Sequence, residues 1–144
     1  MKLWISLLLA LAAVPALAET ADWGVYQQGS ALELAMDRNS IWVEKDGLVH
    51  FVNQERFSER QYDKATDIQY YIRRTTGYAN CAKQQYALIG LEYASKNNRH
   101  LYSSMFPVQR FAWNWQPVYQ NSVADTMLQV VCYLAKTAPH KKSE

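Results

Sequence analysis

The chain has 144 residues, of which 15 are basic and 13 acidic, and its formal net charge is +2 at pH 7. This near-balance argues against a general nucleic-acid binder, because such a protein needs a basic face that neutralises phosphates. With five glycines, no phosphate-binding glycine loop, no His-Glu-x-x-His and no Gly-x-Ser-x-Gly, the sequence indicates no catalytic residues and no cofactor.

The first 18 residues have the features of a signal peptide. Lys2 supplies a positive charge, an apolar run covers residues 3–13, and Ala16-Leu17-Ala18 offers small side chains to a signal peptidase. The run is shorter than the about 20 residues of a membrane-spanning helix, the alternative interpretation. We therefore expect cleavage before Glu19 and a mature chain of 126 residues without an integral membrane segment. Since Glu19 is not a cysteine, we expect no lipid anchor.

The mature chain consists of short segments in which apolar and polar residues alternate, separated by turn residues, which is the pattern of an antiparallel sheet. The expected strands lie at residues 23–25, 32–36, 41–44, 48–57, 68–81, 86–93 and 99–105. Asp46-Gly47 between two of them predicts a hairpin with a type I′ turn. The polar stretch 58–67 has no period and predicts a flexible loop. An aromatic loop at residues 106–119 follows the last strand.

The period of the sequence changes near the C-terminus. Ser122, followed three residues later by Asp125, resembles a capping box with Asp in place of Glu. Apolar residues then recur at helical spacing, which predicts a helix over residues 123–136 that packs on the sheet. Residues 137–144 contain Pro139 and two lysines but no apolar anchor. We expect one domain over residues 19–136 and a flexible tail over residues 137–144.

Both cysteines, Cys81 and Cys132, lie in the mature chain. Export brings them to an oxidising compartment, where a pair of thiols normally closes. The closed loop of about 50 residues would contribute roughly 2–4 kcal/mol. Because Cys132 is on the apolar face of the expected helix, the bond would attach the helix to a sheet strand. A reactive thiol, which needs a neighbouring base and no partner cysteine, is the alternative.

Several residues follow one another in a distinctive order across the mature chain. They are an early Trp, an Asp-x-x-Ser-Ile turn, a strand Val, a Tyr before the first Cys, and a Trp-x-Pro-Val segment that leads through a Ser to the second Cys: Trp23, Asp37, Ser40, Ile41, Val49, Tyr78, Cys81, Trp115, Pro117, Val118, Ser122 and Cys132. In this order and spacing the chain resembles the bacterial surface-adhesin protein E family.

The resemblance implies an α+β fold, an antiparallel sheet of about six strands with one C-terminal helix packed on a face and tied by the disulfide. It also implies a non-enzymatic function, since the founding member is an outer-membrane adhesin that binds host matrix and serum proteins and dimerises. That adhesin is lipid-anchored, whereas this chain lacks the cysteine. Tyr119-Gln120-Asn121 also stands where the family usually has Pro-Gly before Ser.

Two functions therefore remain open for this chain. The first is an exported protein, periplasmic or at the cell surface, that binds a host matrix or serum protein and forms a homodimer as the resemblance implies. The second is a periplasmic structural or interaction module, such as an envelope-complex subunit or an inhibitor, with no host ligand.

Aromatic residues alternate in Phe111-Ala112-Trp113-Asn114-Trp115, and Phe111 and Trp113 are candidate binding residues, because exposed aromatic side chains often mark binding sites. In the alternative, Trp115 and Phe111 close the core below the helix. Trp113 is then the better candidate for an exposed contact.

A second candidate surface is basic and would attract acidic glycans or acidic proteins if its strands pair as a hairpin. It comprises Arg56, Arg60, Lys64, Arg73 and Arg74. The alternative is a solvated rim of mixed charge, since acidic residues interleave these side chains.

Two strand histidines, His50 and His100, would bind haem or a metal only if their strands were neighbours. A solvated or hydrogen-bonded histidine is the more common case, and we expect no metal site.

Overall fold

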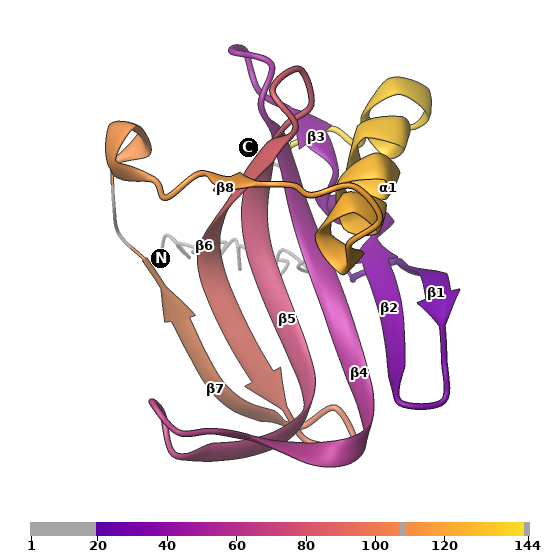
Figure 1. Ribbon diagram of the computed structural model, residues 1–144, viewed down its shortest axis with the longest axis vertical. Coiled ribbons are helices and arrows are strands. Elements are labelled where there is room, and N and C mark those ends of the chain that lie inside the picture. Colours follow the sequence, from indigo (N-terminus) through magenta and orange to yellow (C-terminus); the bar gives the residue numbers. More distant parts are fainter. Residues whose placement is uncertain (1–19, 107–108, 143–144) are drawn as a thin grey trace, which may run out of the picture.

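The structure is a computed structural model that describes residues 20–106 and 109–142. The predicted signal peptide lies outside the described residues. Along the chain the elements are β1 (Trp23–Gln28), β2 (Leu32–Asp37), η1 (Arg38–Ser40), β3 (Trp42–Val43), β4 (Val49–Asp63), β5 (Ile68–Asn80), β6 (Gln85–Ala94), β7 (His100–Met105), η2 (Arg110–Ala112), β8 (Gln116–Pro117) and α1 (Val123–Thr137). The strands form one antiparallel sheet, and α1 covers one end of one face (Figure 1).

The eight strands occupy six positions across the sheet, in the order β1-β2-β4-β5-β6-β7. The short β3 pairs with β4 at Val49 and His50, beyond the part of β4 that pairs with β2. In the same way β8 pairs with β6 at Gln85 and Tyr86, beyond the part that pairs with β7. The predicted sheet with a C-terminal helix is confirmed, and the prediction of about six strands is close to the eight observed. A two-residue strand such as β8 is too short to show alternation.

The hairpin between β3 and β4 is present, but its turn differs from the prediction. Gly47 has a φ of +85°, whereas Asp46 does not take a positive φ. The Gly47 N–H donates to the Glu44 carbonyl over 2.9 Å. The expectation of a type I′ turn is wrong, because that turn needs positive φ at both central residues. One left-handed glycine after an ordinary turn is instead typical of a three-residue hairpin loop.

The stretch 58–67 is not the flexible loop that its composition predicts. Strand β4 continues to Asp63 and β5 begins at Ile68, so only four residues form the turn. A bulge explains why the sequence does not alternate here: Arg56 pairs with Ile72, and the next pair is Gln61 with Tyr70. Four residues of β4 therefore face one residue of β5, and the period of two is lost.

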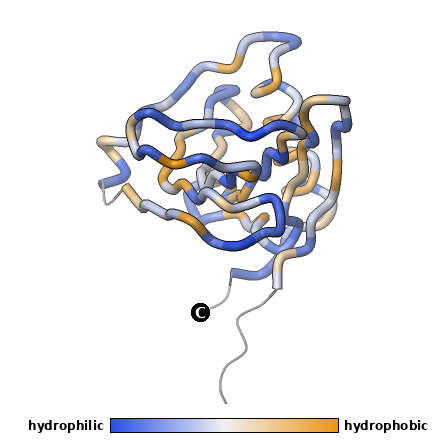
Figure 2. The backbone as a smooth tube through the Cα atoms, turned by 90° about the horizontal axis from the view of Figure 1, so that it is seen from below, coloured by the Kyte–Doolittle hydropathy of each residue, from blue (hydrophilic) through white to orange (hydrophobic). Residues whose placement is uncertain are grey.

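The core lies between α1 and the sheet. Phe51 and Ala79 point from β4 and β5 toward Leu128 and Val131 of the helix, and all four are fully buried. The remaining buried members of this cluster are Met36, Ile41, Val49 and Met127. Figure 2 shows hydrophobic and hydrophilic segments interspersed along the backbone. We call the side that carries α1 the helix-bearing face.

The predicted Ser122 N-cap of α1 is confirmed, although the Asp125 carboxylate accepts from the residue before Ser122 rather than from Ser122 as in a capping box. The Asp125 N–H donates to the Ser122 Oγ over 3.1 Å, and the Asn121 N–H donates to the Asp125 carboxylate over 2.9 Å. Beyond the helix, the His140 N–H donates to the Ile41 carbonyl over 2.6 Å. The flexibility of this tail stays a prediction. Within residues 20–106 and 109–142, no helix is long and apolar enough to cross a membrane.

Candidate binding surfaces

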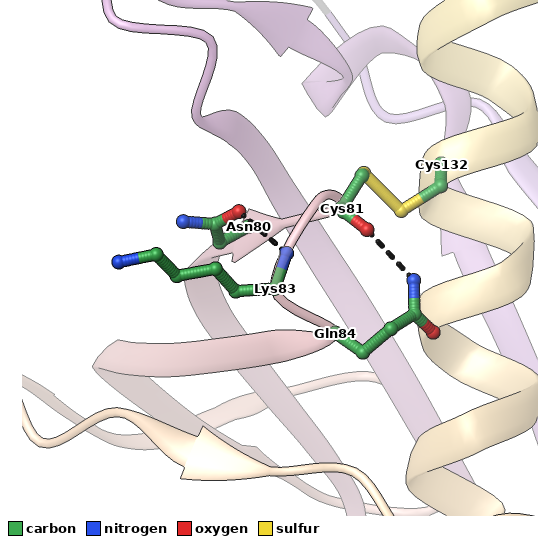
Figure 3. Close-up of a disulfide and its surroundings, with 5 residues drawn as sticks. All are labelled: Asn80, Cys81, Lys83, Gln84 and Cys132. Carbon is green, nitrogen blue, oxygen red and sulfur yellow. Dashed lines mark hydrogen bonds between the residues drawn. A yellow bond between two sulfur atoms is a disulfide. The ribbon is translucent and has the colours of Figure 1, made fainter.

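The Cys81–Cys132 disulfide joins the turn after β5 to the third turn of α1 (Figure 3). Its two Cα atoms are 5.9 Å apart. The Gln84 side chain donates to the Cys81 carbonyl over 2.7 Å, and the Lys83 N–H donates to the Asn80 side chain over 3.0 Å. The turn is therefore ordered by its own hydrogen bonds, and the disulfide lies beside the core, where it links the sheet to α1.

The Asp-x-x-Ser-Ile turn is also structural. The Asp37 carboxylate accepts the Asn39 N–H over 3.0 Å, and the Ser40 hydroxyl donates to the Asp37 carbonyl over 2.6 Å. The same hydroxyl accepts the Val52 N–H over 2.7 Å, which fixes the turn to β4. Ile41 then enters the core. These bonds give the spacing of the motif a structural reason.

The face of the sheet opposite α1 carries a row of stacked rings. Trp42 lies flat on His50, with ring centroids 3.6 Å apart and planes 4° from parallel. Tyr78 meets His50 edge-on at 5.3 Å, and Trp113 stacks on Tyr78 at 4.8 Å. His50 and Tyr78 are register partners on β4 and β5, and they alternate with the core residues Phe51 and Ala79. Trp113 of the aromatic loop therefore packs on the face opposite the helix.

Arg110 and Glu44 fix the base of this aromatic loop. The Arg110 guanidinium lies over the rings of Tyr78 and Trp113, at 5.6 and 5.5 Å from their centroids. It also pairs with Asp46 and lies 3.7 Å from Glu44.

The half-buried Glu44 carboxylate accepts hydrogen bonds from several side chains. Its Oε1 accepts from the Tyr78 hydroxyl over 3.2 Å and from the Lys142 ammonium over 3.3 Å. Burial alone would raise the pKa of the Glu44 carboxyl, but the bonds from Trp42, Lys142 and Tyr78 outweigh it and lower the pKa. The ionised carboxylate thereby joins β3, β5 and the C-terminal segment.

Phe111 projects from this fixed loop. It is 91% exposed, so the interpretation in which Phe111 closes the core is wrong. Trp115 is half-buried, lies outside the core cluster and is tilted against Trp113 with centroids 6.1 Å apart. Trp113 is half-buried because it packs on Tyr78. Of the two predicted aromatic candidates, Phe111 is thus more accessible to a partner than Trp113.

The predicted basic residues do not form one cluster, although their strands do pair. Arg73 and Arg74 are consecutive on β5 and point to opposite faces. Arg73 makes a two-pronged ion pair with Glu55, with both bonds at 2.8 Å. Arg74 pairs with Glu92 on the other face. Arg56 lies 4.0 Å from Glu33.

A different basic group forms at the opposite end of the sheet from α1. Arg60 lies with Lys96 and Arg99 around a shallow depression of about 390 Å³. Within the described part of the chain none of these three makes an ion pair, and Lys64 makes none either. Lys96 and Arg99 were not predicted, because they flank a turn that comes near Arg60 only through the pairing of β5 with both β4 and β6.

The two strand histidines do not meet. His50 is on β4 and His100 on β7, with β5 and β6 between them, so about 14 Å of sheet separates their strands. His50 is buried, and its Nδ1 lies 2.6 Å from the Ser40 carbonyl oxygen. His100 is exposed and lies 3.0 Å from Glu92. The idea of a shared haem or metal site at these histidines is therefore wrong.

Comparisons with known proteins agree on the fold. The model of a family described as surface-adhesin protein E matches residues 23–133. A solved structure of Haemophilus influenzae protein E is similar with a TM-score of 0.53 and 16% identity, over 84% of this chain and 95% of that chain. Protein E from non-typeable Haemophilus influenzae gives 0.54 and 13%, over 91% and 88%. No curated protein sequence matches the chain.

Proposed function

The chain belongs to the surface-adhesin protein E family, and we propose from this premise that it is an exported, non-enzymatic domain that binds another protein through the loop carrying Phe111. The family match supports an adhesin-like protein. The partner we propose is a host matrix or serum protein, as the family resemblance implies, and a homodimer is the oligomer that goes with it.

The observation that carries the proposal is an exposed aromatic side chain on an ordered base. Phe111 is 91% exposed, while its neighbours Arg110 and Trp113 are held by Glu44, Asp46 and Tyr78. Large side chains that fill a pocket of the partner dominate binding energy at protein interfaces. A loop whose neighbouring residues are already held loses little backbone conformational entropy on binding, which favours affinity.

Solid-phase binding with purified protein tests this proposal. The mature protein, oxidised at Cys81 and Cys132, is offered immobilised host matrix and serum proteins in one set of wells and the producing bacterium's own envelope proteins in another. We expect binding to a host protein, weakened about tenfold or more by Phe111→Ala. Tyr133→Ala is the matched control, because Tyr133 is also an exposed aromatic residue but lies on α1.

The outcomes separate the two candidate functions. Binding only to envelope proteins would contradict the host ligand and support the periplasmic interaction module. Equal binding by Phe111→Ala and the unchanged protein would show that the loop is not the contact. No binding in either set would contradict a protein-binding function. Sedimentation equilibrium of the same sample tests the homodimer.

A further inference from the structure

The helix-bearing face has a groove beside the N-terminal end of α1. It has a volume of about 550 Å³, within the range of about 300–1,000 Å³ that is usual for small-molecule sites. Its walls are mostly apolar and come from separate parts of the chain, including Leu32 of β2. Leu88 and Leu91 belong to β6, Phe106 follows β7, and Met127 belongs to α1. In Figure 1 this part of β4, β5 and β6 has no helix in front of it.

Two polar side chains lie in the floor of the groove. Asn53 and Thr75 are register partners on β4 and β5 and are only 4% and 9% exposed. The Asn53 side-chain oxygen accepts from the Tyr26 hydroxyl over 2.7 Å. The Asn53 amide nitrogen and the Thr75 hydroxyl have no hydrogen-bond partner among the residues that the structure describes.

These two groups must be reached from the groove itself. Among the described residues, no completely buried side-chain nitrogen or oxygen lacks a partner, so both atoms retain contact with solvent through the opening. A nearly buried donor without a protein partner is costly unless water or a ligand satisfies it. The floor therefore offers two donors to a ligand that carries acceptor oxygens.

The groove has no uncompensated charge. Arg73 and Glu55 line one end, and they neutralise each other through the two bonds of 2.8 Å. A ligand with a carboxylate would have to compete with Glu55 for the guanidinium. An uncharged head group would leave this pair intact.

We propose that this groove binds a single-chain amphipathic lipid with an uncharged, oxygen-bearing head, of which a monoacylglycerol is the simplest example. The acyl chain lies against Leu88, Leu91 and Met127, and the head accepts hydrogen bonds from the Asn53 amide and the Thr75 hydroxyl. An extended peptide fits less well, because each of its residues brings one donor and one acceptor. The floor offers the Asn53 amide and the Thr75 hydroxyl, which cannot satisfy a run of peptide groups.

The test uses the mature protein and the fluorescent apolar probe N-phenyl-1-naphthylamine. We expect the probe to bind and monoolein to displace it. Thr75→Val removes the hydroxyl with little change of shape and should weaken displacement by monoolein about three- to tenfold. Thr76→Val is the matched control, because Thr76 is the next residue on the same strand and points to the opposite face; it should leave displacement unchanged.

A second pair of variants tests the location. Leu88→Trp fills the groove from a partly exposed position and should abolish probe binding, whereas Val43→Trp, exposed on β3, should not. Melting curves confirm that each variant is folded.

Failure of monoolein to displace the probe would overturn the proposal, as would equal displacement from Thr75→Val and Thr76→Val. If oleate displaced the probe as well as monoolein does, the proposed preference for an uncharged head group would be overturned. Probe binding per protein molecule that falls as protein concentration rises would also overturn it, because a second copy of the chain would then cover the groove. Phe111→Ala should leave the lipid result unchanged, so this test is independent of the protein-binding proposal.

Discussion

The two halves of the helix-bearing face are built from the same strands but differ in what covers them. Under α1, β4 and β5 contribute Phe51 and Ala79, both fully buried among apolar residues. A few residues further along the same face, the same strands contribute Asn53 and Thr75 to an open groove. The difference teaches that the position of α1 decides which part of the face is core and which part can bind.

The largest effect is expected when one leucine in each half of the face is truncated to alanine. Leu128→Ala removes a fully buried side chain of α1 and should cost about 2–5 kcal/mol of the free energy of unfolding. Leu91→Ala, on the wall of the groove, should cost less than about 1 kcal/mol, because water already reaches this side chain. Urea denaturation of both variants measures the difference. Equal losses would mean that the groove is as closely packed as the core.

Removal of the disulfide tests whether this bond is needed to hold α1 on the sheet. Cys81→Ala with Cys132→Ala should lower the free energy of unfolding by about 2–4 kcal/mol, because the unfolded chain regains the freedom of its 51-residue separation. Urea denaturation of this variant and of the reduced unchanged protein should give the same value. A variant as stable as the oxidised protein would show that packing alone positions α1.

The opposite face provides a smaller test that should leave the groove untouched. Burial beneath Trp42 lowers the pKa of His50, against the opposing hydrogen bond to the Ser40 carbonyl. The unfolded chain then binds a proton more readily than the folded one, so stability falls as pH drops below about 6.5. For each unit by which the pKa of His50 is lowered, the loss in the free energy of unfolding is up to about 1.4 kcal/mol.

Denaturation between about pH 7.5 and pH 5.5 measures this slope. His50→Asn should flatten it, whereas His100→Asn retains His50 and should keep it. An unchanged slope in His50→Asn would assign the pH dependence to other groups.

Local signals in the sequence were sufficient for the helix and for most strands. Ser122 forms the N-cap that the sequence predicts, and the helical period places Leu128 and Val131 in the core. The end of β4 was missed because a bulge removes the alternation on which the prediction depended.

The candidate sites depended on information that lies outside any local pattern. Arg110, the neighbour of the exposed Phe111, lies against Glu44, a residue far away in the sequence. Arg73 and Arg74 looked like one patch until strand geometry placed them on opposite faces. Thr75 differs from Thr76 only by the face it occupies and by where α1 lies, so no pattern in the sequence could single it out.

The most direct measurement is methyl nuclear magnetic resonance of the oxidised mature protein during a titration with monoolein. We predict that the methyl signals of Leu88, Leu91 and Thr75 shift, while those of Ile41 and Val131 under α1 do not. Shifts confined to the covered half, or no shifts at all, would contradict the division of the helix-bearing face into a sealed core and an open binding groove.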